Sequence, residues 1–141
     1  METDNILTIE ASKNGLIKKL VDSGLNLREV TPINQGRYFI LCFKEKSVLL
    51  AFKRDTFHNF GIQFKELGYS GVGDTLNKED IGIALDHGVS EIFTIFPRGI
   101  IYKISMKDFL KKSLEWTNKE GKEVLSISIH EYNPAFDLGL N

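Results

Sequence analysis

The segment between residues 38 and 52 carries the strongest structural signal in the chain. It reads Tyr38-Phe-Ile-Leu-Cys-Phe43, a charged connector beginning Lys44-Glu-Lys46, and Val48-Leu-Leu-Ala-Phe52. Two apolar, aromatic-rich runs with so short a connector predict an antiparallel hairpin. Neither run alternates with polar residues, which is typical of strands covered on both faces. We therefore expect helices on each side of the sheet that contains this hairpin.

On both sides of this segment, the spacing of hydrophobic residues predicts the other elements. Leu16, Ile17, Leu20 and Val21 form one apolar stripe, which indicates a helix from Ser12 to Gly24. Further strands are predicted at 6–9, 27–33, 91–96, 100–104 and 124–129, and further helices at 78–86 and 106–116. Alternation in the last strand indicates one wet face, and we expect a loose tail from about residue 134. The sequence predicts one α/β domain over residues 1–141, with a mixed sheet flanked by helices.

The amino-acid composition excludes several classes of protein. The chain has 141 residues, with 18 Lys and Arg against 19 Asp and Glu. Its one cysteine, Cys42, excludes an internal disulfide and a cysteine-based zinc cluster, and we expect it in the core. His58, His87 and His130 lack the spacing of a zinc pair. No apolar run approaches ~18 residues and the first residues lack a signal-peptide layout, so we expect a soluble, cytoplasmic protein without a membrane partner.

The layout resembles the restriction-endonuclease-like superfamily, specifically the archaeal Holliday-junction resolvase type. The matching segments are Leu16-Ile-Lys-Lys-Leu20 through Gly24, Leu27–Ile33, Gly36-Arg-Tyr-Phe-Ile40 and Val48-Leu-Leu-Ala-Phe-Lys53, in this order. In that family an opening helix leads to a strand, a Gly-x-Asp strand and a strand bearing Glu-x-Lys, and a helix with further strands completes the sheet. The resemblance implies a restriction-endonuclease-like fold over about residues 12–105.

The family's metal site is degenerate in this sequence. The resemblance implies carboxylates that hold a divalent metal and a lysine near the attacking water. The position of the Asp falls on Arg37 and that of the Glu falls on Ala51, while Lys53 matches the lysine. Mg²⁺ demands oxygen ligands, and a guanidinium repels the ion. We therefore expect no metal site and no metal-dependent cleavage.

An active nuclease remains an alternative if other acids move into the site. Asp55, two residues after Lys53, is the best candidate, followed by Glu45 and Glu10. In that case Lys53 and Asp55 would be catalytic, and Mg²⁺ would be the cofactor.

A basic stretch points to nucleic acid. Between residues 37 and 65 cations outnumber acids by four, although the net charge of the chain is −1. Phosphate binding needs local positive charge, so we expect nucleic acid, with DNA favoured, to bind there. The expected binding residues are Arg37, Lys44, Lys46, Lys53, Arg54, His58 and Lys65. The simpler interpretation is that these cations are ordinary solvated surface and that Phe57, Phe60 and Phe64 belong to the core.

Two further interpretations stay open. Gly68, Gly71 and Gly73 precede a helix that Thr75 or Asn77 can cap, which favours a flexible loop over a phosphate-binding loop, although Tyr69 and Asp74 could face a substrate. From Gly71 onward acids outnumber cations by eleven to eight, as a protein-interaction module without a nucleic-acid role would permit. The resemblance also implies a homodimer, because nuclease-type folds of this group commonly dimerise, and we expect it to form through the last strand and the 106–116 helix.

Overall fold

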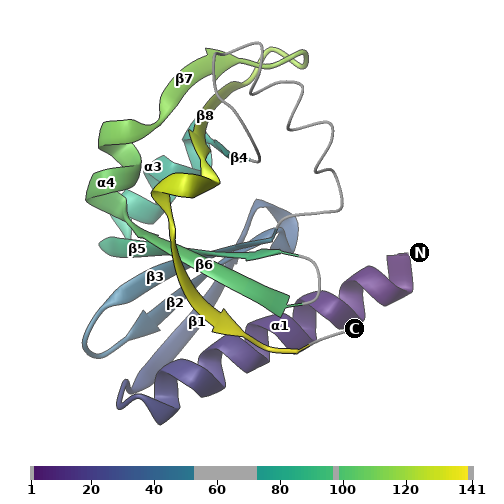
Figure 1. The fold of residues 1–141 in the computed structure, drawn as a ribbon, viewed down its shortest axis with the longest axis vertical. Helices are drawn as coiled ribbons and strands as arrows, with labels where there is room; N and C mark the ends of the chain where they lie inside the picture. Colours follow the sequence, from purple (N-terminus) through teal and green to yellow (C-terminus); the bar gives the residue numbers. More distant parts are fainter. Residues whose placement is uncertain (1, 53–72, 97–98, 140–141) are drawn as a thin grey trace.

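The structure is a computed structural model that describes residues 2–52, 73–96 and 99–139 (Figure 1). Its helices are α1 (Glu2–Asp22), α3 (Lys78–Asp86) and α4 (Met106–Lys112). Its strands are β1 (Leu27–Ile33), β2 (Tyr38–Phe43), β3 (Ser47–Phe52), β4 (Gly73–Asn77), β5 (Val89–Phe96), β6 (Ile100–Ser105), β7 (Leu114–Thr117), β8 (Glu123–Ser128) and β9 (Asn133–Asp137). Single 3₁₀ turns occur at η1 (Asn34–Gly36) and η3 (Ile129–Glu131). Within these ranges no helix has the length and apolar character needed to cross a membrane.

Six of the strands form a mixed sheet in the order β1-β2-β3-β5-β6-β9. β3 and β5 run parallel, and the other described neighbours in this sheet run antiparallel. Because parallel strands need a crossover, α3 lies between β3 and β5 in the chain and packs on the sheet. A smaller antiparallel sheet, β4-β8-β7, lies beside α3 and α4 (Figure 1).

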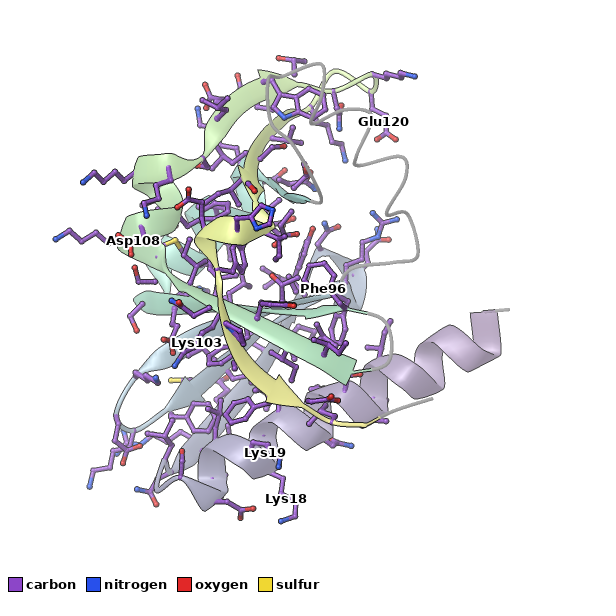
Figure 2. The ribbon with its side chains drawn as sticks, in the orientation of Figure 1. Lys18, Lys19, Phe96, Lys103, Asp108 and Glu120 are labelled. Carbon is purple, nitrogen blue, oxygen red and sulfur yellow. The ribbon has the colours of Figure 1, made fainter. Side chains whose placement is uncertain are left out.

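Helix α1 covers one face of the six-stranded sheet (Figure 1). Leu16 and Leu20 of α1 are buried against side chains of that face, which include Leu41, Leu50 and Phe93. Burial of each such side chain contributes about 1.5–3 kcal/mol. The helix is therefore held by a narrow apolar stripe, while its Lys18 and Lys19 point into solvent (Figure 2).

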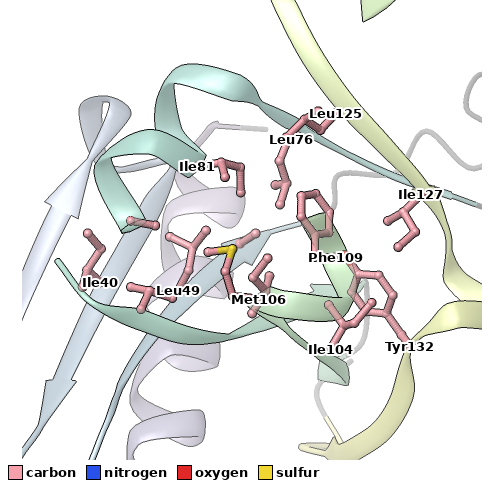
Figure 3. Close-up of a cluster of buried hydrophobic side chains, with 14 of the residues drawn as sticks. Ile40, Leu49, Leu76, Ile81, Ile104, Met106, Phe109, Leu125, Ile127 and Tyr132 are labelled. Carbon is pink, nitrogen blue, oxygen red and sulfur yellow. The ribbon is translucent and has the colours of Figure 1, made fainter. Parts of the chain in front are cut away.

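A second core fills the opposite face of the sheet (Figure 3). There Leu49 and Ile92 of the sheet meet Ile81 of α3 and Phe109 of α4, all at most 2% exposed. The smaller sheet covers this core with Leu76, Leu125 and Ile127. The expectation of helices on both faces of the 38–52 hairpin is thus confirmed.

The predicted elements in the middle of the chain are confirmed with small changes of bounds. The 27–33 strand, the 38–52 hairpin and the 78–86 helix all form, and the strands predicted at 91–96 and 100–104 gain one or two residues. The strand predicted at 6–9 is wrong, because these residues belong to α1. Ile9 continues the helical apolar stripe towards Leu16 and packs on the same core, so no strand is needed to bury it.

The helix predicted at 106–116 is too long. α4 ends at Lys112, and the following residues form β7, in which Leu114 pairs with Ser126 and Trp116 with Val124. The Trp116 indole Nε1 also donates to the Ser126 hydroxyl at 2.7 Å. This strand pairing outweighs the local helical period. The dimer surface expected from this helix and the last strand would therefore consist of α4, β7 and β8, and dimer formation stays a prediction.

The end of the chain differs most from the sequence pattern. β8 has no wet face, because every residue from Val124 to Ser128 is buried: Leu125 and Ile127 face the core, and Ser126 lies under Trp116. The tail expected to be loose from about residue 134 forms β9, the edge strand beside β6. Phe136 of β9 stacks on Phe93 with 6.5 Å between ring centroids, which anchors the strand.

Candidate functional site

The candidate site lies at the carboxyl ends of the parallel strands β3 and β5. Ligands in open α/β sheets commonly bind beyond the carboxyl ends of the strands. β3 ends at Phe52 and β5 ends at Phe96, which Figure 2 labels. Across this end of the sheet Tyr38 pairs with Ala51, and Ala51 pairs with Thr94.

Arg37 lies at this edge, directly before β2. It is exposed, and its φ of −73° and ψ of −29° place it outside the extended ladder. Tyr38 is paired with Ala51, so Arg37 lies one residue from the partner of Ala51 on the adjacent strand. Positions 37 and 51 are the two to which the resemblance assigns carboxylates. They carry a guanidinium and a methyl group. These groups supply no oxygen ligand, so the pair does not fit a divalent metal.

Behind this edge, Asp74 of β4 forms a buried hydrogen-bonded cluster. Its Oδ2 accepts from the Thr94 hydroxyl at 2.8 Å and from the Tyr132 hydroxyl at 2.8 Å. Asp74 is 2% exposed and Thr94 is fully buried. Burial, with the Asp74 charge second, raises the pKa of the Tyr132 phenol well above its usual value. The cluster joins the two sheets through a carboxylate that is shielded from water.

Asp80 of α3 forms a second buried contact near the same edge. Its Oδ2 accepts from the Asn34 amide Nδ2 at 2.9 Å, and the residue is 5% exposed. Burial raises the pKa of the Asp80 carboxyl, and the hydrogen bond from Asn34 opposes that rise. Burial likewise raises the pKa of the Tyr38 phenol, and the charges of Asp74 and Asp80 add to the effect.

Two of the predicted binding cations lie at the other end of the hairpin. Lys44 and Lys46 occupy the β2–β3 turn, about 20 Å from Arg37 at ~3.3 Å per strand residue. Lys46 Nζ forms an ion pair with Glu91 Oε1 at 2.8 Å, while Lys44 is exposed. The structure therefore does not bring Lys44 and Lys46 together with Arg37 in one patch.

The acids proposed as replacement ligands do not meet at the edge. Glu45 lies in the same β2–β3 turn, where its carboxylate accepts from the Asn26 backbone and side-chain amides at 2.9 Å and 2.7 Å. Those bonds lower the pKa of Glu45. Glu10 pairs with Lys13 at 3.1 Å on α1, which covers the opposite face of the sheet from Asp74 and Asp80.

The remaining predicted residues lie outside the described ranges. These are Lys53, Arg54, Asp55, His58 and Lys65, together with the aromatic residues between 57 and 64 and the glycine-rich segment up to residue 72. Of that segment the structure describes Gly73–Asn77, which is strand β4 and not a loop.

A shallow groove at the start of α3 has balanced charge. It has a volume of about 380 Å³ and is lined by Asn77, Lys78, Glu79, Lys122 and Glu123. Lys78 is committed to ion pairs with Glu115 at 2.6 Å and with Glu123 at 3.3 Å. Two cations against two acids give a phosphate little attraction, so Arg37 is the better candidate contact.

The other reactive side chains do not form a site in the described part of the chain. No three His, Cys, Asp or Glu side chains there group closely enough to hold a metal ion. His87 Nδ1 lies 2.9 Å from the Ile83 carbonyl oxygen. Cys42 is half-buried rather than fully buried, although its neighbours Leu41 and Phe43 in β2 are buried.

Sequence reasoning missed the buried acids as members of a site. Asp74 was expected only within a glycine-rich segment that could face a substrate, and Asp80 was not predicted as a site residue. Their partners Asn34, Thr94 and Tyr132 lie 20 to 58 residues away in the chain. No local pattern relates residues so far apart.

Comparison with protein-family models, curated proteins and solved structures finds no match for this chain.

Proposed function

We propose that this chain binds nucleic acid at the edge marked by Arg37, on a restriction-endonuclease-like fold that lacks metal-dependent cleavage. The observation that carries the proposal is the pairing of Tyr38 with Ala51, which sets exposed Arg37 beside the carboxyl end of β3. At this point a nuclease of that family would hold its metal. A cation here favours a phosphate and disfavours a metal ion.

The element order supports the fold part of the proposal. α1 leads to the β1-β2-β3 meander, β4 of the smaller sheet and α3 come next, and β5 and β6 extend the larger sheet. Apart from β4, this is the order of helix, three strands, helix and further strands that the resemblance implies. The parallel β3–β5 pair also gives the sheet one carboxyl edge at which a ligand site can form.

The electrostatics support phosphate binding over catalysis. Arg37 is exposed, whereas Asp74 and Asp80 are buried and accept hydrogen bonds from Thr94, Tyr132 and Asn34. A guanidinium offers two parallel donors to a phosphate.

One observation favours the alternative of an active nuclease with rearranged carboxylates. Asp74 and Asp80 come from different elements, yet the charges of both act on the Tyr38 hydroxyl. Two acids near one edge are part of what a metal site needs, although their oxygens are already engaged by protein donors.

The proposal is tested by binding of fluorescein-labelled duplex DNA and of a four-way DNA junction over a series of salt concentrations. We expect affinity to fall with salt, and Arg37→Ala to reduce the slope of log K against log salt by about 1. Arg28→Ala is the matched control, because Arg28 is also exposed but lies near the start of β1, at the opposite end of that strand from Arg37. Equal slopes for the two variants, or no salt-dependent binding by the unaltered chain, would favour a protein-interaction module instead.

Cleavage is measured on the same DNA substrates with Mg²⁺ or Mn²⁺. We expect intact DNA. Metal-dependent products that disappear in Asp74→Asn, Asp80→Asn, Asp55→Ala or Lys53→Ala would establish the active nuclease and contradict the proposal.

A further inference from the structure

The turn that precedes Arg37 has an unusual backbone. Asn34, Gln35 and Gly36 have φ angles of 51°, 57° and 82°, so three successive residues are left-handed. Gly36 accepts this conformation without strain, and asparagine tolerates it better than most residues, but glutamine does not. Four-residue hairpin connections are usually built on a right-handed turn. Something beyond the local sequence must therefore select this hand.

Two hydrogen bonds hold the turn in place. The Arg37 backbone N–H donates to the Asn34 carbonyl oxygen at 3.1 Å and closes it. The Asn34 side-chain Nδ2 donates to Asp80 Oδ2 at 2.9 Å and ties it to the first turn of α3. Asp80 is 5% exposed, so water competes poorly for this bond. The second bond spans 46 residues and cannot form until α3 has packed on the sheet.

Arg37 depends on this turn more than the next residues do. Tyr38 is fixed by ladder pairs with Ile33 and Ala51, whereas Arg37 precedes β2 and has a non-extended backbone. The direction in which its side chain leaves the sheet is therefore set by the turn and not by the pleat of the strand. If the turn relaxed to the right-handed form, the guanidinium would leave from a different point.

We infer that Asn34 and Asp80 are positioning residues for Arg37, because their hydrogen bond selects the left-handed turn that presents the Arg37 side chain at the carboxyl edge of the sheet. This inference rests on the proposed function only in what Arg37 contacts, namely a nucleic-acid phosphate. The positioning itself is a property of the folded chain and can be measured without a ligand.

The test exchanges the two partners at pH 7.5. Asn34→Asp alone opposes two carboxylates and breaks the bond, while the double variant Asn34→Asp/Asp80→Asn restores it with donor and acceptor reversed. If the single variant is unfolded at 25 °C by circular dichroism, Asp80→Ala replaces it, because it deletes the acceptor and leaves every residue of the turn unchanged.

The first readout is hydrogen exchange of the Arg37 amide, followed by NMR. We expect exchange at least about tenfold faster in the single variant, because a hydrogen bond to a charged group that is worth about 1.4 kcal/mol changes the opening equilibrium tenfold. Exchange should return to within about twofold of the unaltered chain in the double variant. Unchanged exchange in the single variant would overturn the inference, whether or not the chain binds DNA.

The second readout is binding of the labelled DNA duplex. We expect the single variant to bind about tenfold more weakly, with the loss in salt slope that Arg37→Ala shows, and the exchanged pair to bind normally. In an Arg37→Ala background the single variant should have no further effect. An equal loss in that background would overturn the positioning role. If Arg37→Ala itself leaves binding unchanged, the proposed function fails, and the exchange measurement still decides the inference.

Discussion

Tyr132 and Asp74 lie 58 residues apart in the chain, yet the Tyr132 hydroxyl donates to Asp74 Oδ2 at 2.8 Å. Tyr132 follows η3 near the end of the chain, and Asp74 belongs to β4 at the start of the smaller sheet. Both residues are buried, so neither can exchange this bond for one with water. The contact fixes the smaller sheet over the carboxyl edge of the larger one, where Thr94 binds the same oxygen.

Removing the Tyr132 hydroxyl should destabilise the fold measurably. Tyr132→Phe leaves a buried carboxylate with one donor fewer, which costs about 1–3 kcal/mol in the free energy of unfolding. Urea denaturation measures this cost. Tyr102→Phe is the control: Tyr102 is half-buried with its ring edge-on to Phe96, and the described residues show no hydrogen bond to its hydroxyl. Equal losses in the two variants would mean that ring packing, not the Asp74 bond, matters.

The core under α4 should be sensitive to truncation. Phe109→Ala deletes a fully buried ring and should lower the free energy of unfolding by about 3–5 kcal/mol. Leu110→Ala, at the next position of the same helix, removes a side chain that is 45% exposed and should change it by less than ~0.5 kcal/mol. Thermal and urea unfolding compare the two. A small effect at Phe109 would contradict the packing shown in Figure 3.

Stability should depend on acid pH through Asp80. Its pKa is raised in the folded state, so the protonated carboxyl favours folding. This contribution is fully present below about pH 4, the usual value for aspartate, and is lost as pH rises through the raised pKa. Asp80→Asn keeps an acceptor for Asn34 but cannot titrate. From pH 3 to pH 7 the melting temperature of the unaltered chain should therefore fall relative to that of Asp80→Asn. A difference in melting temperature that stays constant over this pH range would refute the prediction.

Alkaline pH should destabilise the protein through two phenols. The pKa values of Tyr38 and Tyr132 are raised by burial in the folded state. Their contribution is complete below about pH 10 and is lost as pH rises further, because the unfolded chain ionises first. Urea unfolding between pH 8 and pH 11 should show this decline, and absorbance at 295 nm should show delayed phenolate formation. Tyr38→Phe should flatten part of the decline; an unchanged slope would exclude Tyr38 as a source.

Two glycines, one inside α3 and one just after it, should change stability in opposite directions when replaced by alanine. Gly82 lies within α3, and a Cβ there meets nothing within 4 Å, so Gly82→Ala should stabilise the fold by about 0.5–1 kcal/mol. Gly88 also has open space, but its φ of 72° is left-handed. Gly88→Ala should therefore destabilise by about 1–2 kcal/mol. Melting temperatures of both variants check the signs; stabilisation at position 88 would contradict the backbone conformation.

The elements that could be predicted from the sequence are those whose signal is local. The unbroken apolar runs on both sides of Lys44-Glu-Lys46 predicted the hairpin and its coverage by helices, and the stripe through Leu16 and Leu20 predicted α1. It also identified Arg37 and Ala51 as positions without an oxygen ligand, which follows from residue identity alone. Whether the resemblance to nucleases extends to function stays a prediction.

Tertiary structure alone decided the features that depend on distant partners. Residues 114–117 became a strand because β8 was there to pair with them, and residues 133–137 became one because β6 offered an open edge. The bonds of Asp74 and Asp80 and the left-handed turn before Arg37 likewise arise from contacts between distant segments. The hydrophobic periodicity of the sequence predicts which residues are buried, but not which element covers them. That choice is made only when the whole chain has packed.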